Sequence, residues 1–161
     1  MPGGRESWGR DATCGLPTLE ETLRLAQGRI QLDVELKEPG CERDAIELLL
    51  RYFPLNGFCV TSFLTPVLRE TRAIHPDIRT GLIFATWNES IRAAALSADV
   101  DLLVAHYRLL DESETMGKPI FVWTVDDPGL IRELFGRPLV EAIVTNNPRQ
   151  ALMLRRQLLK D

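Results

Sequence analysis

The stretch Arg-Ile-Gln-Leu-Asp-Val-Glu-Leu-Lys at residues 29–37 decides how the rest of the chain is interpreted. Apolar and polar side chains alternate in it, and a period of two is typical of a β-strand with two different faces. Gln31, Asp33, Glu35 and Lys37 form the polar face. This pattern fits a solvated edge strand. It fits equally well a strand of a (β/α) barrel, whose polar face points inward and ends at the catalytic rim.

Strand and helix patterns alternate outward from this strand. Further strands are predicted at residues 57–63, 80–84, 100–106, 120–125 and 140–145, with helical patterns between them. Such alternation indicates parallel strands joined by right-handed crossovers. We therefore predict an α/β fold, which is either an incomplete TIM-barrel-like (β/α) repeat with about six of eight parallel strands and covering helices, or an open doubly wound sheet. An open doubly wound sheet is less well supported, because no glycine-rich phosphate loop follows any strand.

Several helix starts carry local signals. Thr18 and Glu21 have the spacing of a capping box, which predicts a helix over residues 17–27. A potential capping residue precedes proline at Thr65-Pro66, Asp127-Pro128 and Asn147-Pro148. Only residues 109–118 separate two of the predicted strands, so the helix there must be about one turn long or missing.

Composition limits the class of protein. The 161 residues are 45% hydrophobic and 26% charged, as expected for one globular domain, which we place at residues 16–161 after a flexible arm at 1–15. A net charge of -4 without a dense basic run argues against nucleic acid as a partner. No apolar run is long enough to cross a bilayer, so the simplest location is cytoplasmic. Three cysteines without metal-site spacing are expected to be ordinary thiols.

Chemistry in parallel α/β folds lies at the carboxyl ends of the strands. Glu35 and Lys37 stand there on one strand face. A carboxylate beside a lysine suits a hard divalent cation, Mg²⁺ or Ca²⁺, together with an anionic substrate oxygen. The alternative is a buried Glu-Lys pair without a catalytic role. Ser62 and Phe63 follow at the end of the next strand and are candidate substrate contacts.

Two aromatic side chains are further candidates at strand ends. His106 is the histidine placed best for acid–base work, although no other candidate lies near it in the sequence. Trp123 either stacks on a substrate or fills the mouth of the barrel. His75, in a His-Pro pair that ends a helix, is expected to be a surface cap.

Five blocks of the sequence resemble the glycerophosphodiester phosphodiesterases, which are metal-dependent TIM barrels, and they occur in that family's order. They are Leu-Pro-Thr-Leu-Glu-Glu at 16–21, Val-Glu-Leu-Lys at 34–37, Thr-Ser-Phe at 61–63, Val-Trp-Thr-Val at 122–125 and Ala-Ile-Val-Thr-Asn-Asn-Pro at 142–148. The last block departs from the family's pattern, because Asn146 and Asn147 stand where the family usually has an aspartate.

The resemblance implies roles for some residues. Glu35 matches a metal-binding carboxylate, Lys37 matches the lysine near the substrate phosphate, and Trp123 matches a tryptophan at the pocket wall. The family's His-Arg-Gly strand, its Glu-Asn-Thr segment, its other metal carboxylate and its His-Asp segment have no counterpart here. Both histidines expected to act as acid and base belong to those segments.

The implied activity is metal-assisted hydrolysis of a glycerophosphodiester to glycerol 3-phosphate and an alcohol. Because a TIM barrel takes about 250 residues, we expect a shortened member of the family that is weakly active or inactive alone. The alternative is a non-catalytic, barrel-derived module that binds a partner or an anionic ligand. Open barrel edges would also favour a homodimer.

Overall fold

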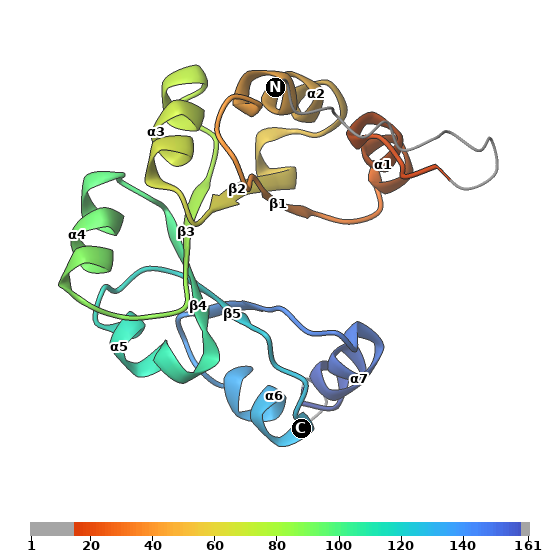
Figure 1. Ribbon diagram of the computed structural model, residues 1–161. Helices are drawn as coiled ribbons and strands as arrows, with labels where there is room; N and C mark the ends of the chain where they lie inside the picture. The colour runs from red at the N-terminus through yellow and green to blue at the C-terminus, as the bar shows by residue number, and fades with distance from the viewer. Residues whose placement is uncertain (1–14, 159–161) are drawn as a thin grey trace, which may run out of the picture.

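The computed structural model describes residues 15–158 as a curved parallel sheet with helices on its convex side. Figure 1 shows a C-shaped arrangement whose two arms face each other across an open gap. The strands follow one another in chain order, and each pairs in parallel with the next. This arrangement confirms the predicted incomplete (β/α) barrel with six strands.

The observed elements lie close to their predicted positions. The strands are β1 (Leu32–Glu35), β2 (Phe58–Ser62), β3 (Thr80–Phe84), β4 (Leu102–His106), β5 (Ile120–Trp123) and β6 (Val140–Ile143). The helices are α1 (Leu19–Ala26), α2 (Glu42–Tyr52), α3 (Thr65–Ile74), α4 (Glu89–Ser97), α5 (Leu110–Glu114), α6 (Pro128–Leu134) and α7 (Pro148–Leu158), with short 3₁₀ turns at η1 (Leu55–Gly57) and η2 (Tyr107–Leu109). The short α5 confirms the abbreviated crossover between β4 and β5.

Most of the predicted helix caps are present. Thr18 and Glu21 form the complete capping box of α1, and the Asp127 carboxylate accepts a hydrogen bond from Leu130 N at the start of α6. The prediction for Thr65 was wrong. The N-cap of α3 is Leu64, which makes no side-chain capping bond, so Thr65 already lies inside the helix.

The alternation in β1 separates its two faces as predicted. Leu32, Val34 and Leu36 pack in the apolar cluster between the sheet and the helices, whereas Asp33 and Glu35 are exposed on the other face. Ile30 was predicted to belong to this strand, but it precedes β1 and is 61% exposed. The polar face of β1 therefore faces the concave side of the half-barrel.

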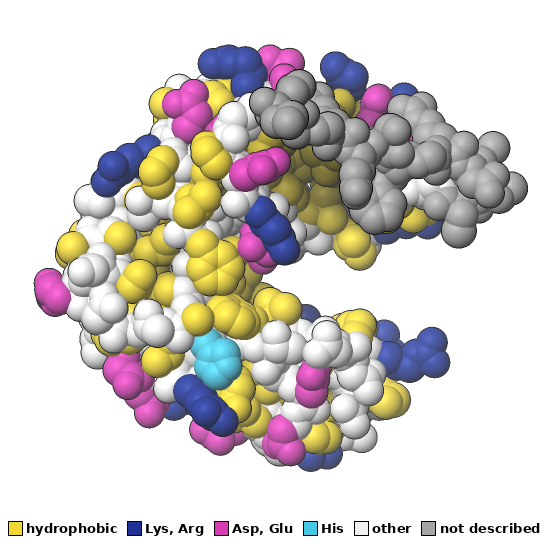
Figure 2. All heavy atoms as spheres, viewed as in Figure 1, with side chains coloured by type: hydrophobic (Ala, Val, Ile, Leu, Met, Phe, Trp, Pro, Cys, Tyr) yellow, Lys and Arg dark blue, Asp and Glu magenta, His cyan; other side chains and the backbone are white. Residues whose placement is uncertain are grey.

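Three apolar clusters hold the sheet together. Two lie under the helices, one around α1, α2 and β1 and the other around α4 to α7. The third lies on the concave side and contains Cys59, Ile83, Leu102, Val104 and Phe121. Figure 2 shows hydrophobic side chains lining the inner face between the two arms. The interior of the half-barrel is thus largely apolar below its polar rim.

An ion pair spans the concave side at the amino-terminal ends of the strands. Both guanidinium nitrogens of Arg79, just before β3, donate to the Glu141 carboxylate on β6, each at 2.5 Å. The Arg79 guanidinium lowers the pKa of Glu141 below its usual value. Because β3 and β6 are not neighbours in the sheet, this pair helps to fix the curvature.

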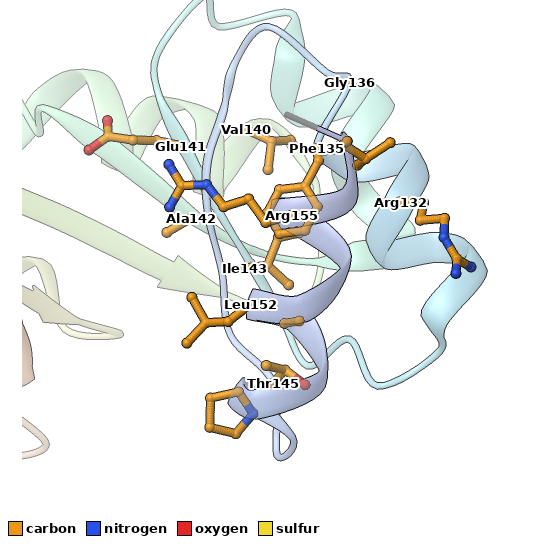
Figure 3. A pocket seen from close by; sticks show the side chains of 13 residues that line it. Arg132, Phe135, Gly136, Val140, Glu141, Ala142, Ile143, Thr145, Leu152 and Arg155 are labelled. Carbon is orange, nitrogen blue, oxygen red and sulfur yellow. The ribbon is translucent and has the colours of Figure 1, made fainter. Parts of the chain in front are cut away.

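Within residues 15–158, the edge of β6 that has no neighbouring strand borders a groove of about 750 Å³. Figure 3 shows side chains of β6, α6 and α7 around it, including Ile143, Leu152 and Arg155. Leu152 is 52% exposed and Leu158 is 43% exposed. The groove therefore leaves apolar surface open beside an unpaired strand edge.

Predictions were also made for the cysteines, the N-terminal residues and membrane-spanning segments. Cys41 and Cys59 are free thiols, as expected, while Cys14 and residues 1–14 of the arm predicted at 1–15 lie outside the described residues. Within residues 15–158, no helix has the length and apolar character needed to cross a membrane.

Candidate functional site

Glu35 and Lys37 lie together at the carboxyl end of β1. The Lys37 Nζ is 3.9 Å from Glu35 Oε2, and the two side chains are 80% and 36% exposed, respectively. Such an exposed pair contributes little to stability, so it is not the buried structural pair considered from the sequence. Both side chains are free to contact a ligand at the rim.

Aromatic side chains continue the rim at the ends of β2, β4 and β5. The Phe63 and Trp123 rings meet edge to face with centroids 6.2 Å apart, and Trp123 meets His106 in the same way at 5.4 Å. Trp123 Nε1 donates to the carbonyl of Val104, which fixes the indole on the concave side. These contacts bring together three predicted site residues that lie far apart in the sequence.

One ring nitrogen of His106 is engaged by a backbone hydrogen bond. Its Nδ1 accepts a hydrogen bond from Arg108 N at 3.3 Å, so neutral His106 carries its proton on Nε2. Its ring also packs against Tyr107, with centroids 4.5 Å apart. His106 can therefore donate a hydrogen bond from Nε2. His75 is the C-cap of α3, as predicted.

Ser62 occupies a different environment from the other candidates. Its side chain is fully buried, its hydroxyl donates to the Leu36 carbonyl at 2.6 Å, and it accepts from Leu64 N at 3.0 Å. These bonds turn Ser62 toward the end of β1 and away from the open rim.

Asp33 is a polar residue of β1 for which the sequence predicted no role. Its Oδ1 accepts a hydrogen bond from Thr61 Oγ1 at 2.8 Å and a weaker one from Cys59 Sγ at 3.6 Å. Burial raises the pKa of Asp33 above its usual value, and this effect outweighs the two hydrogen bonds, which lower it. Part of the residue still reaches water at the concave surface.

We expect Asp33→Asn to stabilise the protein at neutral pH. A folded-state pKa above the unfolded value means that Asp33 favours folding at acid pH and loses that contribution as pH rises through the folded-state pKa. The gain in unfolding free energy at pH 7 should be at most about 1 kcal/mol, because water reaches part of the side chain. Urea unfolding at pH 7 and at about pH 4 measures it.

The gain in unfolding free energy from Asp33→Asn should be smaller at the lower pH than at pH 7. Asp77→Asn, which alters an exposed aspartate, is the control and should change little at either pH. A gain in unfolding free energy for Asp33→Asn that is equal at both pH values would contradict the raised pKa of Asp33 in the folded state.

A hydrogen-bond network links the loops that follow β5 and β6. The Asp126 carboxylate accepts from Thr145 Oγ1 at 2.9 Å and from Asn146 N and Nδ2, both at 2.8 Å. The Asn146 side chain contributes most to lowering the pKa of Asp126. An aspartate at 146 would face Asp126 with a second carboxylate. The structure thus gives a physical reason for asparagine at this position.

We expect Asn146→Asp to lower the melting temperature at neutral pH, because it removes a donor and places two carboxylates together. The double variant Asp126→Asn/Asn146→Asp should recover most of the loss, since it reverses donor and acceptor. A thermal double-mutant cycle measures the coupling. The lowered pKa means that the native contribution of Asp126 is present above its unfolded pKa and is lost as pH falls.

Asn147→Asp provides the matched control for this cycle. Asn147 Oδ1 accepts from Gln150 N at the start of α7, and an aspartate can cap in the same way. It should therefore leave the melting temperature nearly unchanged. Equal losses from Asn146→Asp and Asn147→Asp would show that added negative charge alone is responsible.

Residues 15–158 contain no cluster of potential metal ligands. No group of three potential ligands among His, Cys, Asp and Glu occurs within residues 15–158. Glu35 fits one oxygen-ligand position of a hard cation, while Asp33 Oδ1 is already engaged by Thr61. A second hollow of about 430 Å³ lies near Asp33, Arg79 and Glu141, away from the rim. Neither it nor the groove beside β6 includes Glu35 or Trp123 among its lining residues.

Comparison with known proteins supports the resemblance to one family. No family model matches the chain. A glycerophosphodiester phosphodiesterase from Caldanaerobacter subterraneus subsp. tengcongensis is 24% identical over 153 residues, a match that covers 88% of this chain and 63% of that protein. The chain thus spans less than two thirds of this relative's length.

Solved structures of similar proteins share the fold. A glycerophosphodiester phosphodiesterase from Parabacteroides distasonis superposes with a TM-score of 0.70 and 24% identity, covering 88% of this chain and 65% of that one. A phosphodiesterase from Oleispira antarctica, solved with its product sn-glycerol-3-phosphate, gives a TM-score of 0.72 and 22% identity. That match covers 87% of this chain and 61% of the other.

Proposed function

We propose that this chain, as a relative of the glycerophosphodiester phosphodiesterases, carries part of a site for hydrolysing a glycerophosphodiester to glycerol 3-phosphate and an alcohol. The observation that supports this most directly is the placement of Glu35 and Lys37 on the concave rim of β1. The sn-glycerol-3-phosphate bound by the Oleispira antarctica relative supports the substrate class.

The exposed pair has complementary roles in this proposal. Glu35 contributes one oxygen ligand to a divalent cation, Mg²⁺ or Ca²⁺, which when bound polarises a phosphoryl oxygen. Lys37 offsets negative charge on the substrate phosphate. Phe63 and Trp123 supply an apolar wall beside them, on which the carbon chain of the substrate rests.

His106 has a secondary role in the proposal. Its Nε2 proton is available for donation, and its contact with Trp123 places it beside the same apolar wall. The neutral ring can donate a hydrogen bond to a substrate oxygen, whereas proton transfer to the departing alcohol would require the imidazolium form. His106→Gln retains a donor but cannot exchange a proton, so it distinguishes this role from simple hydrogen bonding.

We expect the 161-residue chain to bind metal weakly and to turn over substrate slowly or not at all. One carboxylate holds a hard cation poorly, since such ions take six or more oxygen ligands. Titration with Mn²⁺, followed by electron paramagnetic resonance, measures the affinity. Glu35→Gln should abolish the weak binding, while Glu38→Gln, an exposed neighbour, should retain it.

Hydrolysis of glycerophosphocholine with Mg²⁺ or Ca²⁺ provides the second measurement. Metal binding that persists unchanged in Glu35→Gln would refute the proposed site. Rapid hydrolysis that Glu35→Gln abolishes would support the proposed reaction. It would also show that the prediction of slow turnover is wrong.

A non-catalytic role is the second candidate function, favoured by the open strand edges. Among the described residues, β1 and β6 each have only one neighbouring strand, and apolar side chains such as Leu152 lie exposed beside β6. Exposed edges of this kind pair with other chains. The module would then assemble as a homodimer through these edges.

Light scattering coupled to size-exclusion chromatography tests this second role. A concentration-dependent dimer that Leu152→Glu converts to monomer would support it. A monomer at all concentrations would exclude it. Arg149→Glu, an exposed change on the same helix, controls for altered charge.

A further inference from the structure

The backbone of Leu36, which lies between Glu35 and Lys37, is held on both sides by hydrogen bonds. Leu36 N donates to the Thr61 carbonyl at 2.9 Å, and the Leu36 carbonyl accepts from Ser62 Oγ at 2.6 Å. The Leu36 side chain is 7% exposed and packs in the cluster under the helices. Leu36 is thus anchored through its side chain and both its backbone groups.

This anchoring continues the pairing between β1 and β2 by one residue. The regular strand ends at Glu35, opposite Thr61. At the next position, the Ser62 hydroxyl satisfies the Leu36 carbonyl in place of a backbone donor. The same hydroxyl accepts from Leu64 N at 3.0 Å, which fixes its orientation. The β1 end is therefore tied to the loop that leaves β2.

Residues 35 and 37 lie two apart, so an extended backbone projects their side chains to one face, while Leu36 points to the other. Rotation of the Leu36–Lys37 peptide would carry Lys37 away from Glu35. The bond from Ser62 opposes that rotation, because a turned carbonyl would lose its partner inside a buried environment.

We propose that Ser62 is a positioning residue, whose hydroxyl fixes the backbone between Glu35 and Lys37 and so holds both side chains on the concave rim. This inference rests on the proposed function, because that proposal assigns Glu35 to metal binding and Lys37 to the substrate phosphate. Ser62 does not contact the ligand in this role. It acts through the Leu36 carbonyl.

Two variants of buried serines test the role. Ser62→Ala removes the donor to Leu36, whereas Ser113→Ala removes a buried hydroxyl that donates to the Leu109 carbonyl, far from β1 in the sequence. Amide hydrogen exchange by NMR reports on the Leu36 N–H. We expect exchange there to accelerate about tenfold in Ser62→Ala, relative to amides in α6, and to stay unchanged in Ser113→Ala.

Ser62→Thr keeps the hydroxyl and should restore protection of the Leu36 amide, even if the extra methyl group lowers overall stability. Mn²⁺ affinity supplies a separate readout, and we expect Ser62→Ala to weaken it several-fold while Ser113→Ala does not. Unchanged exchange at Leu36 in Ser62→Ala, or equal acceleration in Ser113→Ala, would overturn the positioning role.

The two proposals fail in distinguishable ways. If Glu35→Gln leaves Mn²⁺ binding intact, the proposed metal site is wrong, whatever the exchange data show. If Glu35→Gln abolishes binding but Ser62→Ala neither changes Leu36 exchange nor weakens the affinity, the site stands and the role of Ser62 is refuted.

Discussion

Gly81→Val should lower the free energy of unfolding by about 3 kcal/mol, because the concave cluster has no room for a side chain at this position. A Cβ at Gly81 would lie 2.5 Å from Leu102 Cδ1, 2.9 Å from Leu102 Cγ and 3.1 Å from Thr61 Cγ2. Leu102 and Thr61 are fully buried on the two neighbouring strands. Chemical denaturation measures the loss.

The clash with Leu102 can be tested separately. In a Leu102→Ala background, Gly81→Val should cost much less, because the atoms closest to the new side chain are gone. Gly15→Val is the control, since no atom lies within 4 Å of a Cβ there. An equal loss in both backgrounds would mean that β-strand geometry, and not packing against Leu102, is responsible.

Phe84→Ala should cost about 3–5 kcal/mol, the range for deleting a buried phenylalanine ring. Phe84 is 1% exposed in the larger cluster under the helices, and its ring centroid is 5.3 Å from that of Trp87. The loss combines transfer of the ring to water with the cavity left behind. Urea unfolding followed by circular dichroism provides the measurement.

Phe63→Ala is the matched control for Phe84→Ala. Phe63 is 50% exposed at the rim, so its removal should cost less than about 1 kcal/mol. Similar losses for the two variants would contradict the description of the core. A greatly reduced denaturant slope in Phe84→Ala would instead indicate that the two arms no longer unfold together.

The boundaries of the elements could be predicted wherever a local signal was strong. The capping box at Thr18 and the cap at Asp127 depend on bonds within one helical turn, and both are present. Predictions failed where a signal was ambiguous. Thr65 looked like a cap before Pro66, yet the helix begins one residue earlier because proline is also accommodated at its second position.

The candidate site was predicted in part. Glu35, Lys37, Phe63, Trp123 and His106 lie at strand ends, where parallel folds place chemistry. Strand alternation places Ser62 on the face opposite to Thr61 and Phe63, but the sequence could not show that its hydroxyl bonds to the Leu36 carbonyl, because that partner lies on another strand. Nor could it reveal the partnership of Asp126 with Asn146, which lie twenty residues apart in separate loops.

Period-two alternation at residues 29–37, the alternating strand and helix patterns and the family resemblance were together enough to predict an incomplete parallel (β/α) barrel and to place Glu35 and Lys37 on one strand face. These features depend on interactions between residues that are close in the sequence, so the sequence alone indicates them. Only the tertiary structure decided the contact of Phe63 with Trp123, the pairing of Arg79 with Glu141 and the anchoring of Leu36 by Ser62. The first two join strands that are not neighbours, so they exist only once the curvature of the sheet has brought those strands together, whereas the third depends on the pairing of β1 with β2.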